Sequence, residues 1–206
     1  MRTFIFDFDG VLADSFQPLY MLNKEAFSFI GIDFSENDYK NLFKDNIHLG
    51  FKSFVKNRED YPKFLEFKKR NFGKYYSSVK LFPEVPDFLP KIKGSRAIVS
   101  ATLNRFILPL LAKSDLEKLF GLILGTQDHT KTKSFKEILK RFNVSSGETF
   151  FVSDTSGDIR SAKSFGFRTV GVTWGFHSEE ELSSSGPDNI AWDFKGLYSY
   201  LTKAGL

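Results

Sequence analysis

The sequence predicts an α/β fold: a mostly parallel sheet, with a block of helices inserted after its first strand. Three observations lead to this prediction. A short apolar run at residues 4–6 has the character of a buried parallel strand. Strand-like and helix-like segments alternate regularly from residue 96 to residue 173. Between residues 15 and 78 the pattern is helical throughout, which is too long for an ordinary connection between strands.

The composition is that of an ordinary globular protein. The chain has 206 residues, of which 41% are hydrophobic and 26% charged, which suits a core domain carrying a smaller insertion. Phenylalanine is unusually frequent, with 25 residues, and it recurs within apolar patterns, so we expect its rings to fill the core. The sequence has no cysteine, so a metal site would need oxygen or histidine ligands.

Charge and hydropathy indicate which partners to expect. The net charge of +4 is mild, and basic residues are interspersed with acidic ones, which favours a solvated surface over a nucleic-acid interface. An anionic small substrate agrees with this balance. The sequence has no run of about 18 apolar residues, so no membrane span is predicted. Asp7 and Asp9 interrupt the apolar amino-terminal segment, so no signal peptide is predicted and a cytoplasmic location is expected.

The helical block is expected to contain four helices. Apolar residues recur there at intervals of three and four, which is the period of an amphipathic helix. Ser35 and Asp38 have the spacing of a capping arrangement, and Pro62 suits the first turn of a helix. The predicted helices begin at Asp14 or Ser15, at Ser35, at residue 47 and near Pro62, and the first of them ends at Gly31.

The rest of the chain repeats a strand–helix unit. Residues 82–86 break the helical pattern with two prolines, and a short helix ending near Gly94 follows. The alternation implies right-handed crossovers and therefore a parallel sheet. Strands are predicted at 96–100, 119–124, 149–153 and 168–173, and helices at 104–113, 134–142 and 157–165.

The first predicted strand ends in two acids, Asp7 and Asp9, followed by Gly10. In an extended chain the two acids point to the same side, because side chains alternate between faces. Burying both carboxylates without a partner would cost on the order of several kcal/mol, so a cation is expected beside them, most simply a metal ion. Taken alone, these residues could equally form a plain Asp-Gly turn after the strand.

Other predicted strands also end in polar residues. Ser100 ends one strand, and Asp154 and Asp158 follow another. Lys131 and Lys133 lie just before a predicted helix. Ligands of parallel sheets bind at the carboxyl ends of the strands, so these side chains are expected to converge with the two acids of the first strand.

Such a set of groups suits phosphoryl transfer. Oxygen ligands with a few carboxylates are what Mg²⁺ prefers. A carboxylate can attack phosphorus and form an aspartyl-phosphate, while a hydroxyl and an ammonium group hold the phosphoryl oxygens.

Four motifs in order resemble those of the haloacid dehalogenase-like (HAD) hydrolase superfamily. They are Asp-Phe-Asp-Gly-Val at 7–11, the apolar strand ending in Ser100, Lys133 upstream of Asp154, and the pair Asp154 and Asp158. The resemblance implies a doubly wound, Rossmann-like core over 1–14 and 80–206. It also implies a helical cap domain over 15–79, as in β-phosphoglucomutase-like and phosphoglycolate phosphatase-like members.

The resemblance assigns roles to the acids. Asp7 would be the nucleophile and a metal ligand. Asp9 would protonate the leaving oxygen, then activate water, and would ligate the metal through its backbone carbonyl. Asp154 would ligate Mg²⁺, with Asp158 as a second metal ligand or as an acid that orients the site.

The resemblance also names the groups that would bind the transferring phosphoryl group: Ser100, Ala101 and Lys133, with Lys131 as the alternative lysine. Two departures from the family pattern stand out. Ser153 takes the place of the usual glycine before the fourth-motif acid, and the frequent Lys-Pro of the third motif is absent.

The predicted function is therefore a Mg²⁺-dependent phosphatase that hydrolyses a small phosphorylated metabolite through an aspartyl-phosphate. A phosphomutase of the β-phosphoglucomutase type is the nearest alternative, because the same pair of acids can return the phosphoryl group to a substrate hydroxyl. A catalytically silent binding or regulatory protein is the alternative from a different class. The sequence leaves the substrate and the oligomeric state open.

Overall fold

A six-stranded sheet forms the centre of the computed structural model, which describes residues 2–44, 47–125 and 131–203. The strand order is β5-β4-β1-β6-β7-β8, and all neighbouring strands are parallel. β1 therefore lies between β4 and β6. The strands are β1 (Thr3–Phe6), β4 (Ser95–Ser100), β5 (Leu122–Gly125), β6 (Thr149–Ser153), β7 (Arg168–Val172) and β8 (Asn189–Ala191).

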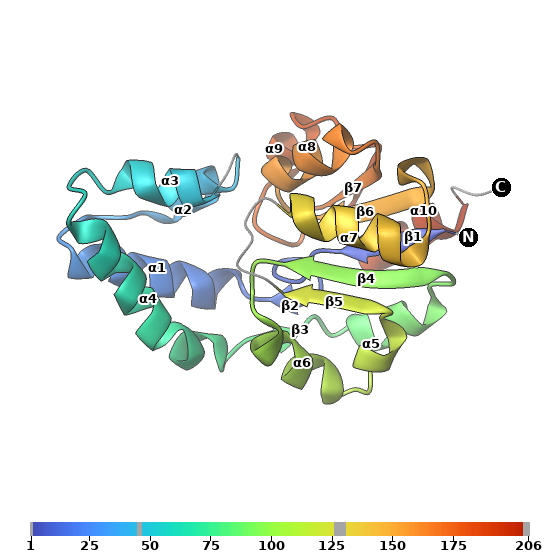
Figure 1. Cartoon of the computed structure of the whole chain (residues 1–206), viewed down its shortest axis with the longest axis horizontal. Helices are drawn as coiled ribbons and strands as arrows, with labels where there is room; N and C mark the ends of the chain where they lie inside the picture. The colour runs from blue at the N-terminus through green and yellow to red at the C-terminus, as the bar shows by residue number, and fades with distance from the viewer. Residues whose placement is uncertain (1, 45–46, 126–130, 204–206) are drawn as a thin grey trace.

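Helices cover both faces of this sheet. In β1, Phe4 and Phe6 pack with side chains of α5, α6 and α10, whereas Ile5 packs with those of α7 and α8 on the opposite face. Figure 1 shows α5 and α6 below the sheet and α7 and α8 above it. The predicted doubly wound α/β fold is thus confirmed. These helices are α5 (Val85–Phe88), α6 (Asn104–Ala112), α7 (Thr132–Phe142), α8 (Ser156–Ser164), α9 (Glu179–Ser183) and α10 (Phe194–Lys203), with short 3-10 turns at Leu89–Lys91, Glu117–Leu119 and Ser146–Glu148.

Four helices project from one end of the sheet (Figure 1). We call residues 16–76, which contain them, the helical insertion. The chain leaves the core after β2 (Ala13–Asp14) and returns through β3 (Lys80–Leu81), and these two short strands pair antiparallel. The four predicted helices are present, and the predicted capping box of Ser35 and Asp38 is confirmed. They are α1 (Phe16–Phe29), α2 (Glu36–Leu42), α3 (Ile47–Phe54) and α4 (Asp60–Tyr76).

The helical insertion has its own hydrophobic core, which is largely aromatic. Phe27 of α1 lies at its centre, and its ring centroid is 4.2 Å from that of Phe34, 6.0 Å from that of Phe51 and 4.5 Å from that of Phe64. The expectation that phenylalanine fills the core is confirmed here. The domain boundaries at 14/15 and 79/80 stay a prediction.

Some local predictions differ from the structure. Asp14 does not cap α1, because it belongs to β2 and pairs with Lys80 of β3. Ser15 holds the N-cap position, although its side chain makes no capping hydrogen bond. The strand predicted at 119–124 is Leu122–Gly125, since a 3-10 turn occupies Glu117–Leu119. The short strands β2 and β3 and the carboxyl-terminal elements α9, β8 and α10 lie outside the predicted elements.

Within the described part of the chain, no helix combines the length and the apolar character that crossing a membrane requires.

A short segment after β7 joins the core to the helical insertion. The ring of Phe176 belongs to the aromatic core of the insertion, where its centroid lies 5.0 Å from that of Phe16 and 4.9 Å from that of Phe43. The amide of Gly157, in the first turn of α8, donates to the carbonyl of Phe43 at 3.1 Å. The insertion therefore contacts the core through apolar packing and also through a directional backbone hydrogen bond.

His177 adds a buried polar link to this contact. Its side chain is 1% exposed, and its Nδ1 accepts a hydrogen bond from the Ser156 amide at 3.0 Å. Nδ1 must then lack a proton, so Nε2 carries it and donates to the carbonyl of Lys40 in α2, also at 3.0 Å. Burial lowers the pKa of His177, which keeps the ring in this neutral form.

We predict that His177 stabilises the protein most strongly above pH 6.5. Replacing it in His177→Asn should lower the free energy of unfolding by about 1–3 kcal/mol at pH 8, because the Lys40 carbonyl loses its buried donor. Because the folded-state pKa lies below the ordinary value of 6.5, the unfolded chain takes up a proton first on acidification. The gap between wild type and variant should therefore narrow as the pH falls below 6.5.

Urea denaturation at several pH values measures this gap. Lys44 and Glu181 form an ion pair of 3.4 Å, and their charges affect the pKa of His177. Both residues are present in both proteins, so their own titration largely cancels in the difference. A gap that stayed constant between pH 8 and pH 5 would contradict the assigned neutral form.

Candidate active site

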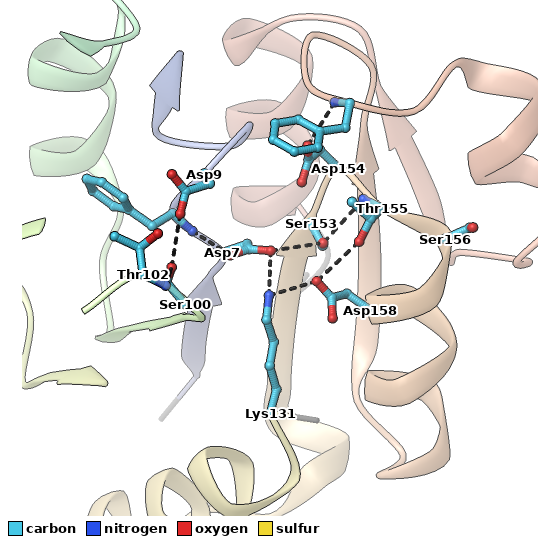
Figure 2. Close-up of polar contacts among 12 residues, drawn as sticks. Asp7, Asp9, Ser100, Thr102, Lys131, Ser153, Asp154, Thr155, Ser156 and Asp158 are labelled. Atoms are coloured by element: carbon cyan, nitrogen blue, oxygen red, sulfur yellow. Dashed lines mark hydrogen bonds and ion pairs between the residues drawn. The ribbon is translucent and has the colours of Figure 1, made fainter. Parts of the chain in front are cut away.

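Asp7 follows directly on β1, at the carboxyl end of the sheet. Its amide extends the ladder to β6 by donating to the carbonyl of Val152 at 2.9 Å, and its side chain is largely buried. One carboxylate oxygen accepts a hydrogen bond from the Phe8 amide at 2.7 Å. The other accepts from the Nζ of Lys131, in a buried ion pair (Figure 2).

Lys131 is shared between two acids. Its Nζ lies 2.7 Å from Oδ2 of Asp158, and the same oxygen accepts a hydrogen bond from the hydroxyl of Thr155 at 3.1 Å. Burial alone would lower the pKa of Lys131, but the negative charges of Asp158 and Asp7 raise it, so the ammonium stays charged. Lys131 has a left-handed backbone conformation, with φ of 53°, and immediately precedes α7.

The structure does not bring Lys133, the lysine preferred by sequence, to this site. α7 begins at Thr132, so Lys133 lies inside its first turn and is exposed. Lys131, the residue just before the helix, instead extends to the carboxyl end of the sheet and pairs with Asp7. Ala101, the other expected phosphate-binding residue with Ser100, is an exposed neighbour of that serine in the loop after β4.

Asp9 occupies a different environment from Asp7. Its carboxylate is only half-buried, and it accepts two hydrogen bonds from hydroxyl groups. Ser100, at the end of β4, donates to Oδ2 at 3.1 Å. Tyr76, in the last turn of α4, donates to Oδ1 at 2.9 Å. Tyr76 was not identified from the sequence, since 67 residues separate it from Asp9 and no motif includes it.

Asp154 follows β6 and is almost completely buried. Its Oδ2 accepts a hydrogen bond from the amide of Phe176 at 2.8 Å. Burial raises the pKa of Asp154 to about 7. Its side chain passes between two glycines: a Cβ at Gly10 would lie 1.9 Å from Oδ2, and one at Gly175 would lie 2.3 Å from the Cβ of Asp154. Gly10 also has a positive φ of 74°, so both its space and its backbone require glycine.

These acids leave the site with an excess of negative charge. Burial raises the pKa of Asp7 well above its ordinary value in spite of Lys131, and the charges of Asp158 and Asp154 add to this effect. Oδ1 of Asp154 is buried and has no hydrogen-bond partner among the described groups. An unpaired buried carboxylate oxygen is costly, so a cation would be stabilising here.

The donor set fits a hard cation such as Mg²⁺. The described residues contain no group of three or more acidic or histidine side chains poised around one point. Mg²⁺ needs no such group, because it keeps several waters and binds through one or two carboxylates. In such a site Asp7 and Asp154 would supply carboxylate oxygens. Asp158, like Asp7, pairs with Lys131, and it also accepts a hydrogen bond from Thr155.

Comparison with known proteins identifies the family of the chain and several relatives. The family model described as haloacid dehalogenase-like hydrolase matches residues 4–172. The chain is 26% identical to a phosphoglycolate phosphatase of Synechococcus elongatus over 91% of both chains. It is 31% identical to a phosphoglycolate phosphatase of Salmonella typhi, in a match that covers 63% of this chain and 56% of that protein.

Solved structures have the same fold. A predicted phosphatase from Clostridium acetobutylicum superposes with a TM-score of 0.85 at 19% identity, over 98% of both chains. A haloacid dehalogenase-like hydrolase from Streptococcus pneumoniae has a TM-score of 0.83 at 17% identity, covering 97% of this chain and 98% of that one. At these identities the likeness concerns the fold alone.

The family model and the sequence relatives together indicate a hydrolase of the phosphatase class. The chain belongs to the haloacid dehalogenase-like hydrolase family, since the family model spans residues 4–172. The resemblance identified from the four sequence motifs is confirmed.

We predict that Lys131, and not Lys133, balances the buried acids. In Lys131→Met the carboxylates of Asp7 and Asp158 lose their cation, which should lower the free energy of unfolding by about 3 kcal/mol at pH 8. The matched variant Lys133→Met removes an exposed lysine two residues away and should change it by less than about 0.5 kcal/mol. Urea denaturation followed by circular dichroism measures both, and equal effects of the two variants would refute the assignment.

Proposed function

We propose that this protein is a Mg²⁺-dependent phosphatase that hydrolyses a small phosphorylated metabolite through an aspartyl-phosphate on Asp7. The observation that carries the proposal is the contrast between two acids only two positions apart. Asp7 is buried and paired with an ammonium group, whereas Asp9 is half-buried and bonded to two hydroxyls. Such a division suits a nucleophile beside an acid–base group.

Each acid then has its own part in the reaction. A carboxylate oxygen of Asp7 attacks phosphorus, and the bond between phosphorus and the leaving oxygen breaks. Asp9 gives its proton to that oxygen. Water then attacks the phosphorus of the aspartyl-phosphate and gives a proton to Asp9, which frees the Asp7 carboxylate and returns both residues to their starting states.

Lys131 and Ser100 are suited to hold the phosphoryl group. The Lys131 ammonium lies at the Asp7 carboxylate, where phosphoryl oxygens would arrive, and its charge compensates theirs. The Ser100 hydroxyl is a donor at the end of the neighbouring strand β4. In this assignment Lys131 takes the place expected for Lys133, and Asp158 positions Lys131.

Asp7 and Asp154 would hold the metal through carboxylate oxygens, and Asp9 through its backbone carbonyl. When bound, Mg²⁺ neutralises charge on the phosphoryl oxygens. The buried Oδ1 of Asp154, which has no hydrogen-bond partner among the described residues, supports this assignment.

We further propose that the helical insertion is a cap that helps to select the substrate. The curated relatives are named phosphoglycolate phosphatases, so a small phosphorylated carboxylate is the first substrate to test. The cytoplasmic location expected from the sequence agrees with a metabolite of this kind. The phosphomutase alternative would give an isomerised sugar phosphate without release of phosphate, and a silent binding protein would give neither product.

We expect Mg²⁺-dependent release of phosphate from p-nitrophenyl phosphate and from at least one member of a panel that includes 2-phosphoglycolate. Asp7→Asn should reduce turnover by at least about a hundredfold, because an amide oxygen is a poor nucleophile. Chelation of the metal should abolish turnover in the wild type. Activity that survived unchanged in Asp7→Asn would exclude the aspartyl-phosphate route.

Binding of Mg²⁺ should also stabilise the fold in the absence of substrate. At a hundred times its dissociation constant, a ligand that binds only the folded state adds about 2.7 kcal/mol. The gain should be larger at pH 8 than at pH 6, because the pKa of Asp154 is about 7 without the metal and Mg²⁺ binds the ionised form.

Thermal melts with Mg²⁺ or with chelator measure this gain. Asp154→Asn should lose it, whereas Asp115→Asn, at an exposed turn far along the chain from the acids, should keep it. An equal gain in both variants would place the metal elsewhere.

A further inference from the structure

The hydroxyl of Tyr76 lies at the acid–base residue but has no part in the reaction described so far. Tyr76 is 3% exposed, and its hydroxyl donates to Oδ1 of Asp9 at 2.9 Å. A buried phenol needs a hydrogen-bond partner, so the contact by itself could be only structural. Three further observations point to a positioning role.

The ring of Tyr76 is fixed by packing on two sides. Its centroid lies 5.1 Å from that of Phe72, one turn earlier in α4, and 5.5 Å from that of Phe106 in the first turns of α6. Phe72 and Phe106 also contact one another, at 4.7 Å. A ring held in this way keeps its hydroxyl in a fixed place beside Asp9.

Tyr76 acts as a donor to Asp9. A phenol keeps its proton at neutral pH, so the hydroxyl of Tyr76 is the donor in its contact with Oδ1 of Asp9. The two oxygens of Asp9 are held from different elements, Oδ1 by Tyr76 of α4 and Oδ2 by Ser100 of β4. Together the two donors define the plane of a carboxylate that is otherwise only half-buried.

Only one of these two donors can remain when substrate arrives. In the proposed function the Ser100 hydroxyl turns to the phosphoryl group, and its bond to Asp9 is lost. Tyr76 is bonded to the opposite oxygen and comes from a different part of the chain. It is therefore free to hold Asp9 throughout the reaction.

We propose that Tyr76 is the positioning residue of the acid–base step: its hydroxyl keeps the Asp9 carboxyl in place while the Ser100 hydroxyl binds the phosphoryl group. The proton that moves belongs to Asp9 and the leaving oxygen, and Tyr76 keeps its own throughout. This inference rests on the proposed function. Through Tyr76, the last helix of the insertion, α4, would directly influence the chemical step.

Comparing substrates with different leaving groups tests whether Tyr76 has this role. An alkyl phosphate needs a proton on its leaving oxygen, whereas p-nitrophenolate departs without one. Loss of a positioned Asp9 should therefore slow transfer to Asp7 from an alkyl phosphate far more than from p-nitrophenyl phosphate. The parameter to compare is kcat/KM, because it reports the steps up to this first transfer.

Tyr76→Phe removes the hydroxyl and keeps the ring between Phe72 and Phe106. We expect kcat/KM for the best alkyl phosphate of the panel to fall about tenfold or more, through kcat with little change in KM. For p-nitrophenyl phosphate the fall should be less than about threefold. The ratio of the two values is measured on one preparation, so partial misfolding of the variant cancels.

Tyr75→Phe is the matched control. It removes the neighbouring phenol on the same helix, whose hydroxyl lies towards Glu25 and not towards the catalytic acids, and it should leave the ratio unchanged. Equal losses on both substrates, or none on the alkyl phosphate, would overturn the role of Tyr76. A wild type that hydrolyses neither substrate would instead overturn the proposed function.

Discussion

Charge balance among buried carboxylates at the carboxyl end of the sheet governs much of this structure. Asp7, Asp154 and Asp158 converge there, and Lys131 forms direct ion pairs with Asp7 and Asp158 (Figure 2). Ionised groups are expensive to bury without partners, so the surrounding backbone is arranged around them. Lys131 takes a left-handed conformation before its helix, and Gly10 leaves room for the carboxylate of Asp154.

Two acids at this end of the sheet, Asp154 and Asp9, connect it to the helical insertion. Asp154 accepts the amide of Phe176, whose ring lies in the aromatic core of the helical insertion, and the next residue, His177, binds α2. On the other side, Tyr76 at the end of α4 binds Asp9. The insertion is therefore attached to the carboxyl end of the sheet at two separate points, each of which involves one of the acids there.

Much of the architecture could be predicted from local patterns. A buried strand, a capping box and an amphipathic helix are short-range features, as the segments at 4–6 and at Ser35 illustrate. The lysine was harder to choose, because Lys131 and Lys133 differ by two positions and only the start of α7 decides which of them faces Asp7. Tyr76 and the partners of His177 could not be predicted, since each contact joins distant segments whose packing has no local signal.

Local sequence patterns were enough to predict most core strands and helices up to β7 in their order, the acids that follow β1 and β6, and the family to which the chain belongs. These follow from hydrophobic periodicity and from motifs whose spacing is set within a few residues. Which donor meets which carboxylate depends instead on the folded packing: Lys131 at Asp7, and Ser100 with Tyr76 at Asp9. Hydrogen bonds and charge compensation act over about 3 Å, and such a distance is set by how helices and strands pack and not by their separation along the chain.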